Sequence, residues 1–172
     1  LGDRIRYDRK MLTPQTLKTQ IRLYCAMKAV NEKYGFDFCG LKGQRELTEY
    51  VCLGDVPEML MNDPYDWDGP KEPVVCATEA DMDGALTMEL FKHVTGEPVL
   101  FADVRHYDAE DNFFDLCNSG AHATFFAGRS KRPEDNLPKV HFWPEVFYFP
   151  AGAASAMSET TVGYTLAEVR DL

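Results

Sequence analysis

Two short apolar segments, each followed by a carboxylate, constrain the fold of this chain more than any other feature. Residues 74–78 are apolar and lead to Glu79, and residues 99–102 are apolar and lead to Asp103. Residues 81–95, between them, have the length and spacing of a crossover helix, which predicts a right-handed βαβ unit with two parallel strands. Both acids are therefore expected at the carboxyl edge of one sheet, where open α/β folds bind ligands.

The crossover helix is expected to bury one apolar face against this sheet. The residues that we assign to that face are Leu86, Leu90, Phe91 and Val94. Asp81 and Asp83 fall in the first helical turn, where free N–H groups and the helix dipole favour carboxylates. Their position favours capping over ligand binding.

A long helix is predicted earlier in the chain, over residues 13–34. Thr13 is placed as its N-cap, Pro14 takes the first helical position, and Gly35 ends it. The further elements that we expect are a strand at 36–41, a turn with Gln44, short helices at 46–50 and 56–61, and a strand at 113–117.

The order of these elements predicts an α/β fold, specifically a Rossmann-like three-layer sandwich with a mostly parallel sheet. Residues 1–138 are expected to form this domain. Residues 139–172 contain Pro-, Gly- and Ala-punctuated apolar runs, which favour antiparallel β structure. We interpret them as the truncated beginning of a β-rich, barrel-like domain.

Composition disfavours two classes of partner. The 172 residues carry a formal net charge of −10, which disfavours nucleic acid and anionic membranes because both require a basic face. These residues include no charged-then-apolar leader and no apolar run of the roughly 18 residues that a spanning helix needs, so we expect neither secretion nor membrane insertion by signals of their own. Five cysteines without a C-x-x-C pair indicate reduced, buried thiols, and we expect a cytoplasmic protein.

Glu79 and Asp103 are the candidates for chemistry. A carboxylate directly after an apolar strand is tolerated when it is paired or binds a metal, and two oxygen ligands suit a hard ion such as Mg²⁺ or Mn²⁺. Acids at strand ends also accept hydrogen bonds from nearby loop N–H groups, so spacing alone leaves metal binding, acid/base catalysis and a structural role open. The four histidines form no metal-binding spacing, and we expect His106 to be structural.

An ordered set of motifs carries a family resemblance. The motifs are CATEADMDGALTM at 76–88, FADVRHYD at 101–108, DLCNSG at 115–120, GLKGQREL at 40–47, NDP at 62–64 and GPKEP at 69–73. With them the chain resembles the L-fucose isomerase and L-arabinose isomerase superfamily, most closely the branch that is similar to L-fucose isomerase. The resemblance covers about residues 13–155 and implies the second α/β domain with the entrance to the C-terminal domain.

The resemblance implies a metal-dependent aldose–ketose isomerase that acts on a free sugar, such as L-fucose or arabinose, through a cis-enediol. Glu79 and Asp103 fall on the family carboxylates that bind the metal, usually Mn²⁺ or another divalent cation, and that carry the proton. Gln44 falls on a glutamine that contacts the monosaccharide. Homo-oligomers are the family habit, which implies a homo-oligomer for the full-length protein.

The third metal ligand in this family is a histidine of the C-terminal domain, and no histidine here occupies that motif. We therefore expect this chain alone to bind metal weakly and to be inactive. An alternative is a non-catalytic α/β module, derived from the isomerase fold, for oligomerisation or sugar sensing. A Rossmann-like nucleotide-binding protein is a third reading, which the absence of a glycine-rich phosphate loop disfavours.

Overall fold

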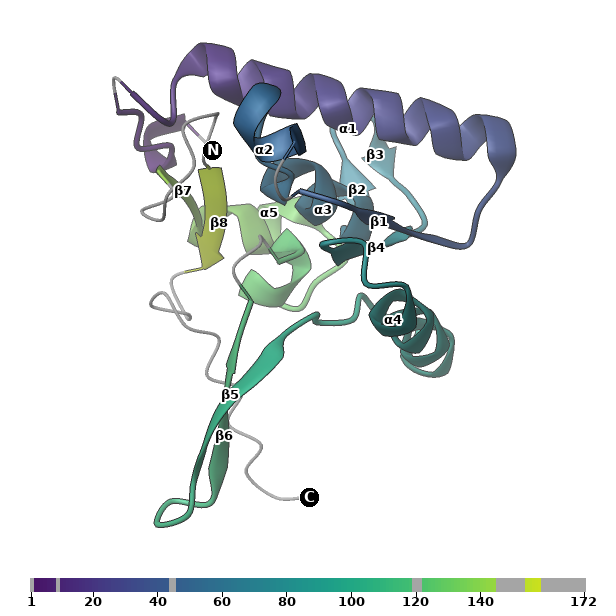
Figure 1. Ribbon diagram of the computed structural model, residues 1–172, viewed down its shortest axis with the longest axis vertical. Coiled ribbons are helices and arrows are strands. Elements are labelled where there is room, and N and C mark those ends of the chain that lie inside the picture. The colour runs from purple at the N-terminus through teal and green to yellow at the C-terminus, as the bar shows by residue number, and fades with distance from the viewer. Residues whose placement is uncertain (1, 9, 44–45, 119–121, 145–153, 159–172) are drawn as a thin grey trace.

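A computed structural model of the chain describes residues 2–8, 10–43, 46–118, 122–144 and 154–158 (Figure 1). The helices in this part of the chain are α1 (Pro14–Tyr34), α2 (Glu46–Tyr50), α3 (Asp55–Asn62), α4 (Met82–Thr95) and α5 (Pro133–Asn136), with 3-10 turns at Gly2–Arg4, Thr124–Ala127 and Leu137–Lys139. The strands are β1 (Phe38–Leu41), β2 (Tyr65–Asp66), β3 (Gly69–Pro70), β4 (Val75–Thr78), β5 (Asp103–Asp108), β6 (Phe113–Cys117), β7 (Val140–Pro144) and β8 (Ala154–Ser158).

The long helix α1 begins and ends where the sequence predicts. The Thr13 hydroxyl accepts from the Thr16 N–H at 3.1 Å, and the Thr16 hydroxyl accepts from the Thr13 N–H at 2.9 Å, which makes a capping box. Gly35 ends the helix with φ 63° and donates its N–H to the Asn31 carbonyl at 2.7 Å. α1 is thus fixed at both ends by local hydrogen bonds.

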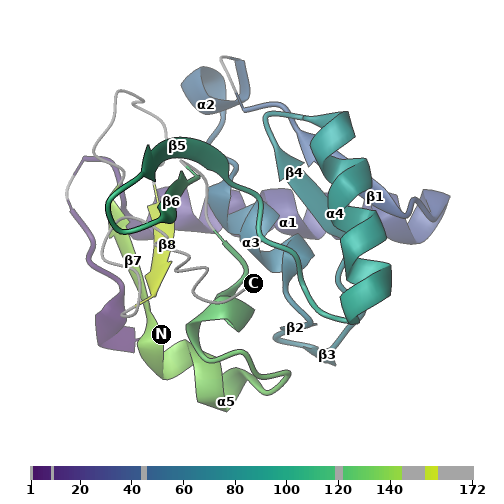
Figure 2. The same cartoon turned by 90° about the horizontal axis from the view of Figure 1, so that it is seen from below.

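Strands β1 and β4 form a parallel pair between two layers of helix. Val75 and Ala77 of β4 pack with Ala85 and Met88 of α4, whereas Cys76 packs on the opposite side with Tyr24 of α1 and Met61 of α3. Figure 2 shows α4 lying across this strand pair. The α/β class with a small parallel sheet is confirmed, while the larger Rossmann-like sandwich and the barrel-like segment stay predictions.

The prediction that residues 99–102 form a strand parallel to β4 is wrong. Residues 99–102 have no strand structure, and β5 begins only at Asp103 and pairs antiparallel with β6. The side-chain amide of Asn62 explains the difference, because its Nδ2 donates to the Cys76 carbonyl at 2.8 Å and its Oδ1 accepts from the Cys76 N–H at 3.1 Å. Asn62 therefore takes the backbone groups of β4 that a neighbouring strand would use. Val99 and Phe101 instead pack their side chains against the α4 side of the core.

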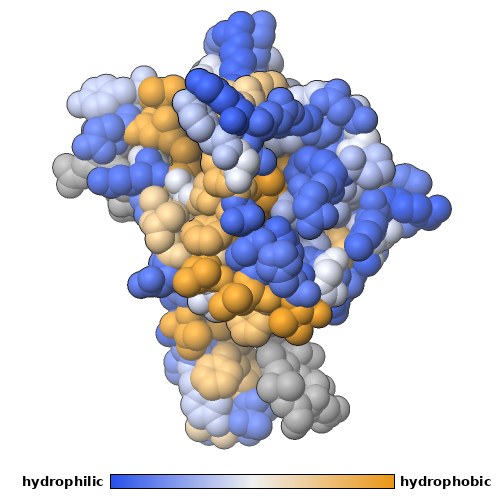
Figure 3. Space-filling model, turned by 90° about the vertical axis from the view of Figure 1, so that its right-hand side faces the viewer, coloured by the Kyte–Doolittle hydropathy of each residue, from blue (hydrophilic) through white to orange (hydrophobic). Residues whose placement is uncertain are grey.

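The apolar face predicted for α4 is also wrong. Leu86, Leu90, Phe91 and Val94 are exposed, and the buried side chains are Ala85, Met88, Glu89 and Lys92. The small Ala85 allows close approach to the sheet, and the two buried charges pair with one another. The Lys92 ammonium contacts the Glu89 carboxylate at 2.9 Å and donates to the Pro73 carbonyl at 3.0 Å. Figure 3, which faces this side of the molecule, shows apolar residues gathered on its surface.

A buried polar cluster joins the loop after β6 to the segment after α3. The Asp63 carboxylate accepts from the Phe125 N–H at 3.0 Å and from the Thr124 hydroxyl at 2.8 Å. The Tyr65 hydroxyl contacts Thr124 and accepts from the Asn136 amide at 2.8 Å. Because Asp63 is fully buried, these bonds fix the loop to α3.

β7 and β8 form an antiparallel pair beyond residue 138. Val140 and Phe142 of β7 belong to the same core cluster as Leu12 and Leu17, and the Phe142 carbonyl accepts from the Arg6 N–H at 2.9 Å. The predicted domain boundary between residues 138 and 139 stays a prediction. None of the described helices combines the length and apolar character needed to cross a bilayer.

Candidate active site

Glu79 lies in a strained turn directly after β4. Glu79 and the following Ala80 have φ of 55° and 56°, a left-handed conformation that non-glycine residues rarely adopt. Asp81 closes the turn by donating its N–H to the Thr78 carbonyl at 3.2 Å, and its side chain caps α4 by accepting from the Gly84 N–H at 2.9 Å. The predicted capping role of Asp81 is confirmed. Backbone strain of this kind persists only where surrounding contacts impose it, and it concentrates at functional sites.

Two glycines on the β1 side make room for this turn. A Cβ atom on Gly40 would lie 2.6 Å from the Ala80 Cα atom, so only glycine permits this approach of the two backbones. A Cβ atom on Gly43 would lie 2.8 Å from Oε1 of Glu79. The Gly43 carbonyl is itself held by the Thr48 N–H at 3.1 Å and hydroxyl at 2.8 Å.

Gln44, the predicted sugar-binding residue, lies outside the described residues. The preceding residue, Gly43, lies beside the carboxylate of Glu79. Asp103 is the first residue of β5, and its carboxylate forms an ion pair with the Arg105 guanidinium at 2.9 Å. Its side chain is 59% exposed, at the base of the β5–β6 hairpin that projects from the molecule (Figure 1).

The sequence predicts that Glu79 and Asp103 follow two neighbouring parallel strands, and this prediction is wrong. Glu79 follows a parallel strand, whereas Asp103 begins an antiparallel one. Their carboxylate oxygens are the kind of ligand that a hard divalent ion prefers, and the Asp103 carboxylate already forms an ion pair with Arg105. Across the described part of the chain, no three His, Cys, Asp or Glu side chains come together as a metal site.

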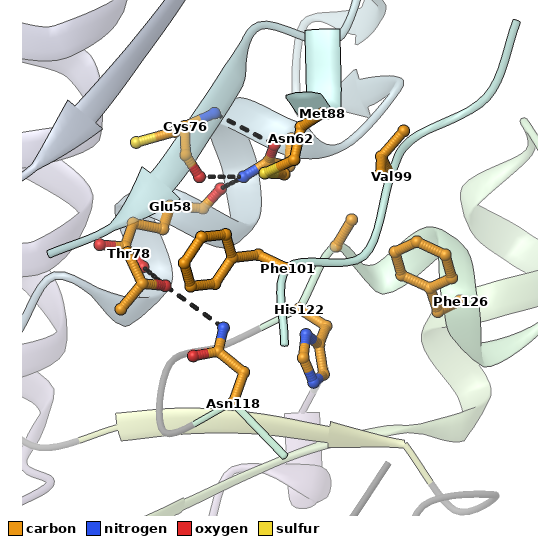
Figure 4. Close-up of a pocket in the computed structure, with 11 residues that line it drawn as sticks. Glu58, Asn62, Cys76, Thr78, Met88, Val99, Phe101, Asn118, His122 and Phe126 are labelled. Carbon is orange, nitrogen blue, oxygen red and sulfur yellow. Dashed lines mark hydrogen bonds between the residues drawn. The ribbon is translucent and has the colours of Figure 1, made fainter. Parts of the chain in front are cut away.

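A pocket lies beside the Glu79 turn, at the end of β4. Figure 4 shows Glu58 of α3, Thr78 of β4 and Asn118 close together, with Phe101 and His122 lining the same pocket. The Thr78 hydroxyl donates to Oε2 of Glu58 at 3.0 Å and accepts from the Asn118 amide at 3.2 Å. The pocket is thus polar at its β4 end and aromatic opposite.

Burial changes the protonation of two pocket residues. Glu58 is 4% exposed, and burial, reinforced by the nearby Glu79 and opposed by the Thr78 hydrogen bond, raises its pKa to about 8. Burial lowers the pKa of His122 to about 4, so its ring is neutral at pH 7. The sequence reasoning missed both as pocket residues. The polar stripe Asp55, Glu58 and Asn62 on an otherwise apolar helix is the signal that could have identified Glu58.

Comparison with known proteins finds a family whose model matches part of the chain. Residues 15–96 match the family described as "L-fucose isomerase, second N-terminal domain". This stretch of the chain resembles the second N-terminal domain of L-fucose isomerase. The matched residues contain Glu79, its turn, and the Glu58 and Thr78 side chains of the pocket, whereas Asp103 follows them.

Curated relatives support the same assignment. The L-fucose isomerase of Klebsiella pneumoniae is 39% identical over 148 residues, which is 76% of this chain and 25% of the relative. An Escherichia coli L-fucose isomerase (strain SMS-3-5) is 32% identical over the same coverage, and that of Vibrio vulnificus is 36% identical over 104 residues, 54% of this chain and 18% of the relative. The resemblance is confirmed, and the chain spans at most about a quarter of the length of these L-fucose isomerases.

Proposed function

We propose that this chain is part of a metal-dependent aldose–ketose isomerase that acts on a free monosaccharide, such as L-fucose or arabinose. One observation carries the proposal. A carboxylate, Glu79, is held by a strained turn at the end of a buried parallel strand, inside the residues that match the L-fucose isomerase domain. Such a conformation has a conformational cost that core packing alone does not require.

In the proposed reaction, Glu79 removes a proton from the carbon next to the sugar carbonyl, and Asp103 supports its delivery to the neighbouring carbon through a cis-enediol. Gln44 would bind a sugar hydroxyl. A divalent ion such as Mn²⁺, held by Glu79 and Asp103, would offset the negative charge that develops on the sugar oxygens. For Asp103 to serve, its carboxylate must exchange part of its ion pair with Arg105 for the ion.

The complete site requires more than this chain. We propose that a histidine elsewhere in the full-length protein supplies the third metal ligand, and that residues 1–138 belong to a Rossmann-like domain and residues 139–172 to a β-rich one. The chain alone would then bind metal weakly and not convert sugars. We further propose that the full-length protein is a cytoplasmic homo-oligomer. We also propose that it has no nucleic-acid or membrane partners, and the net charge of −10 supports this second proposal.

A non-catalytic oligomerisation or sugar-sensing module is the second candidate. The ion pair between Asp103 and Arg105 favours it, because a carboxylate already paired at an exposed hairpin needs no metal to be satisfied.

Substitution in the full-length protein separates the two functions. Glu79→Gln should abolish aldose–ketose conversion and weaken Mn²⁺ binding measured by calorimetry, whereas Glu32→Gln, an exposed site on α1, should change neither. Equal metal binding and activity in wild type and Glu79→Gln would exclude the isomerase site and leave the non-catalytic module.

A further inference from the structure

Thr78 joins the Glu79 turn to the buried interior of the pocket. Its hydroxyl donates to Oε2 of Glu58 at 3.0 Å and accepts from Nδ2 of Asn118 at 3.2 Å. A hydroxyl that both donates and accepts is fixed in one orientation. Thr78 is also the last residue of β4, so its position sets where the following turn starts.

The strained turn is enclosed from two directions. On the β1 side, two glycines leave the space that the turn occupies. A Cβ atom on Gly40 would lie 2.6 Å from the Ala80 Cα atom, and one on Gly43 would lie 2.8 Å from Glu79 Oε1. On the α3 side the contact is the Glu58–Thr78 hydrogen bond (Figure 4). Removing it takes away the side-chain anchor between the end of β4 and α3, and with it one restraint on the start of the Glu79 turn.

We propose that Glu58 is a positioning residue for Glu79, acting through Thr78. The inference deepens the proposed isomerase function and rests on it. α3 is a rigid support for this role, because nearly all its side chains are buried and Asn62 of the same helix also binds Cys76 of β4. α3 thus holds β4 at Cys76 and at Thr78, and the contact at Thr78 sets the start of the Glu79 turn.

The test is Thr78→Val in the full-length, Mn²⁺-loaded protein, because valine keeps the shape of threonine but removes the hydroxyl. We expect Mn²⁺ affinity and kcat to fall by about tenfold, the lower end of the range for lost outer contacts of metal ligands, with KM little changed. Thr78→Ser, which retains the hydroxyl, should restore both values to near wild type. Hydrogen exchange at the Asp81 amide, which closes the turn on Thr78, should speed up in Thr78→Val only.

Thr124→Val is the matched control. Thr124 also donates from its hydroxyl to a buried carboxylate, that of Asp63 at 2.8 Å, in a cluster that does not include the Glu79 turn. Both valine variants should lower the melting temperature, but only Thr78→Val should weaken Mn²⁺ binding. Equal losses of Mn²⁺ affinity in the two variants, or no loss in either, would overturn the positioning role.

Glu79→Gln distinguishes failure of this inference from failure of the proposed function. If Glu79→Gln weakens Mn²⁺ binding and Thr78→Val does not, the positioning role is wrong and the isomerase site stands. If Glu79→Gln has no effect on Mn²⁺ binding, both are wrong.

Discussion

Glu79 reaches across to Gly43, and the missing side chain of Gly43 gives its carboxylate the space that it occupies. A Cβ atom on Gly43 would lie 2.8 Å from Glu79 Oε1, closer than real Cβ contacts. The contact is with the tip of a flexible side chain, so relief requires the carboxylate to move and leaves the backbone in place. The position of the proposed catalytic carboxylate therefore depends on a residue 36 positions earlier in the sequence.

Gly43→Ala should accordingly impair the site and spare the fold. We expect Mn²⁺ affinity of the full-length protein to fall, while the free energy of unfolding changes by less than about 1 kcal/mol, as is usual when a neighbour can adjust. Calorimetric Mn²⁺ titration and urea denaturation measure the two quantities. A loss of stability without a change in Mn²⁺ affinity would contradict this prediction.

Gly40→Ala should have the opposite balance. Its Cβ atom would lie 2.6 Å from the Ala80 Cα atom, and backbone cannot move aside without disturbing β1 or the turn. We expect a loss of about 1–3 kcal/mol in the free energy of unfolding, as for other overpacking substitutions. Urea denaturation beside Gly43→Ala provides the comparison, and a smaller destabilisation by Gly40→Ala than by Gly43→Ala would show the contact to be soft.

The parts of the fold that local signals determine could be predicted from the sequence. Thr13, Pro14 and Gly35 define α1 because capping depends on the residues at the helix ends themselves. The strand predicted at residues 99–102 is absent, because an apolar run indicates burial but not a hydrogen-bonding partner. The group that binds this edge of β4 is the side chain of Asn62, which only the tertiary structure brings there.

The site shows the same division. Glu79 could be identified because it directly follows an apolar strand, yet its left-handed backbone could not, since no glycine or asparagine marks it. Glu58 was missed because its meaning depends on a hydrogen bond to Thr78, 20 residues away. The inward face of α4 was misjudged because Glu89 and Lys92 pair with one another when buried, which apolar periodicity does not reveal.

Asn62→Ala should destabilise the sheet. The Asn62 side-chain amide hydrogen-bonds to both the N–H and the carbonyl of Cys76. A buried backbone group left without a partner lowers the free energy of unfolding by about 1–3 kcal/mol. We expect a fall of that size in the free energy of unfolding by urea. Asn31→Ala is the control, because Oδ1 of Asn31 is buried without a hydrogen-bond partner, and it should be neutral or stabilising. Similar values for the two variants would show that water replaces Asn62 at β4.

Glu58 should make the stability of the protein fall as pH rises. Burial raises its pKa from the usual 4.5 to about 8, so between these values the folded state binds a proton that the unfolded state has lost. Its contribution is complete below pH 4.5 and decreases up to about pH 8. Glu58→Gln, which stays uncharged, should therefore flatten this part of the profile of unfolding free energy against pH, measured by urea denaturation from pH 4.5 to 8.5. Asp63 and His122 also change the stability over this range, because burial moves their pKa values from 3.8 to about 6 and from 6.5 to about 4. The informative quantity is therefore the difference between wild type and variant. A difference that does not change with pH would mean that Glu58 is ionised in the folded protein, and that its bond to Thr78 is one between a hydroxyl and a carboxylate.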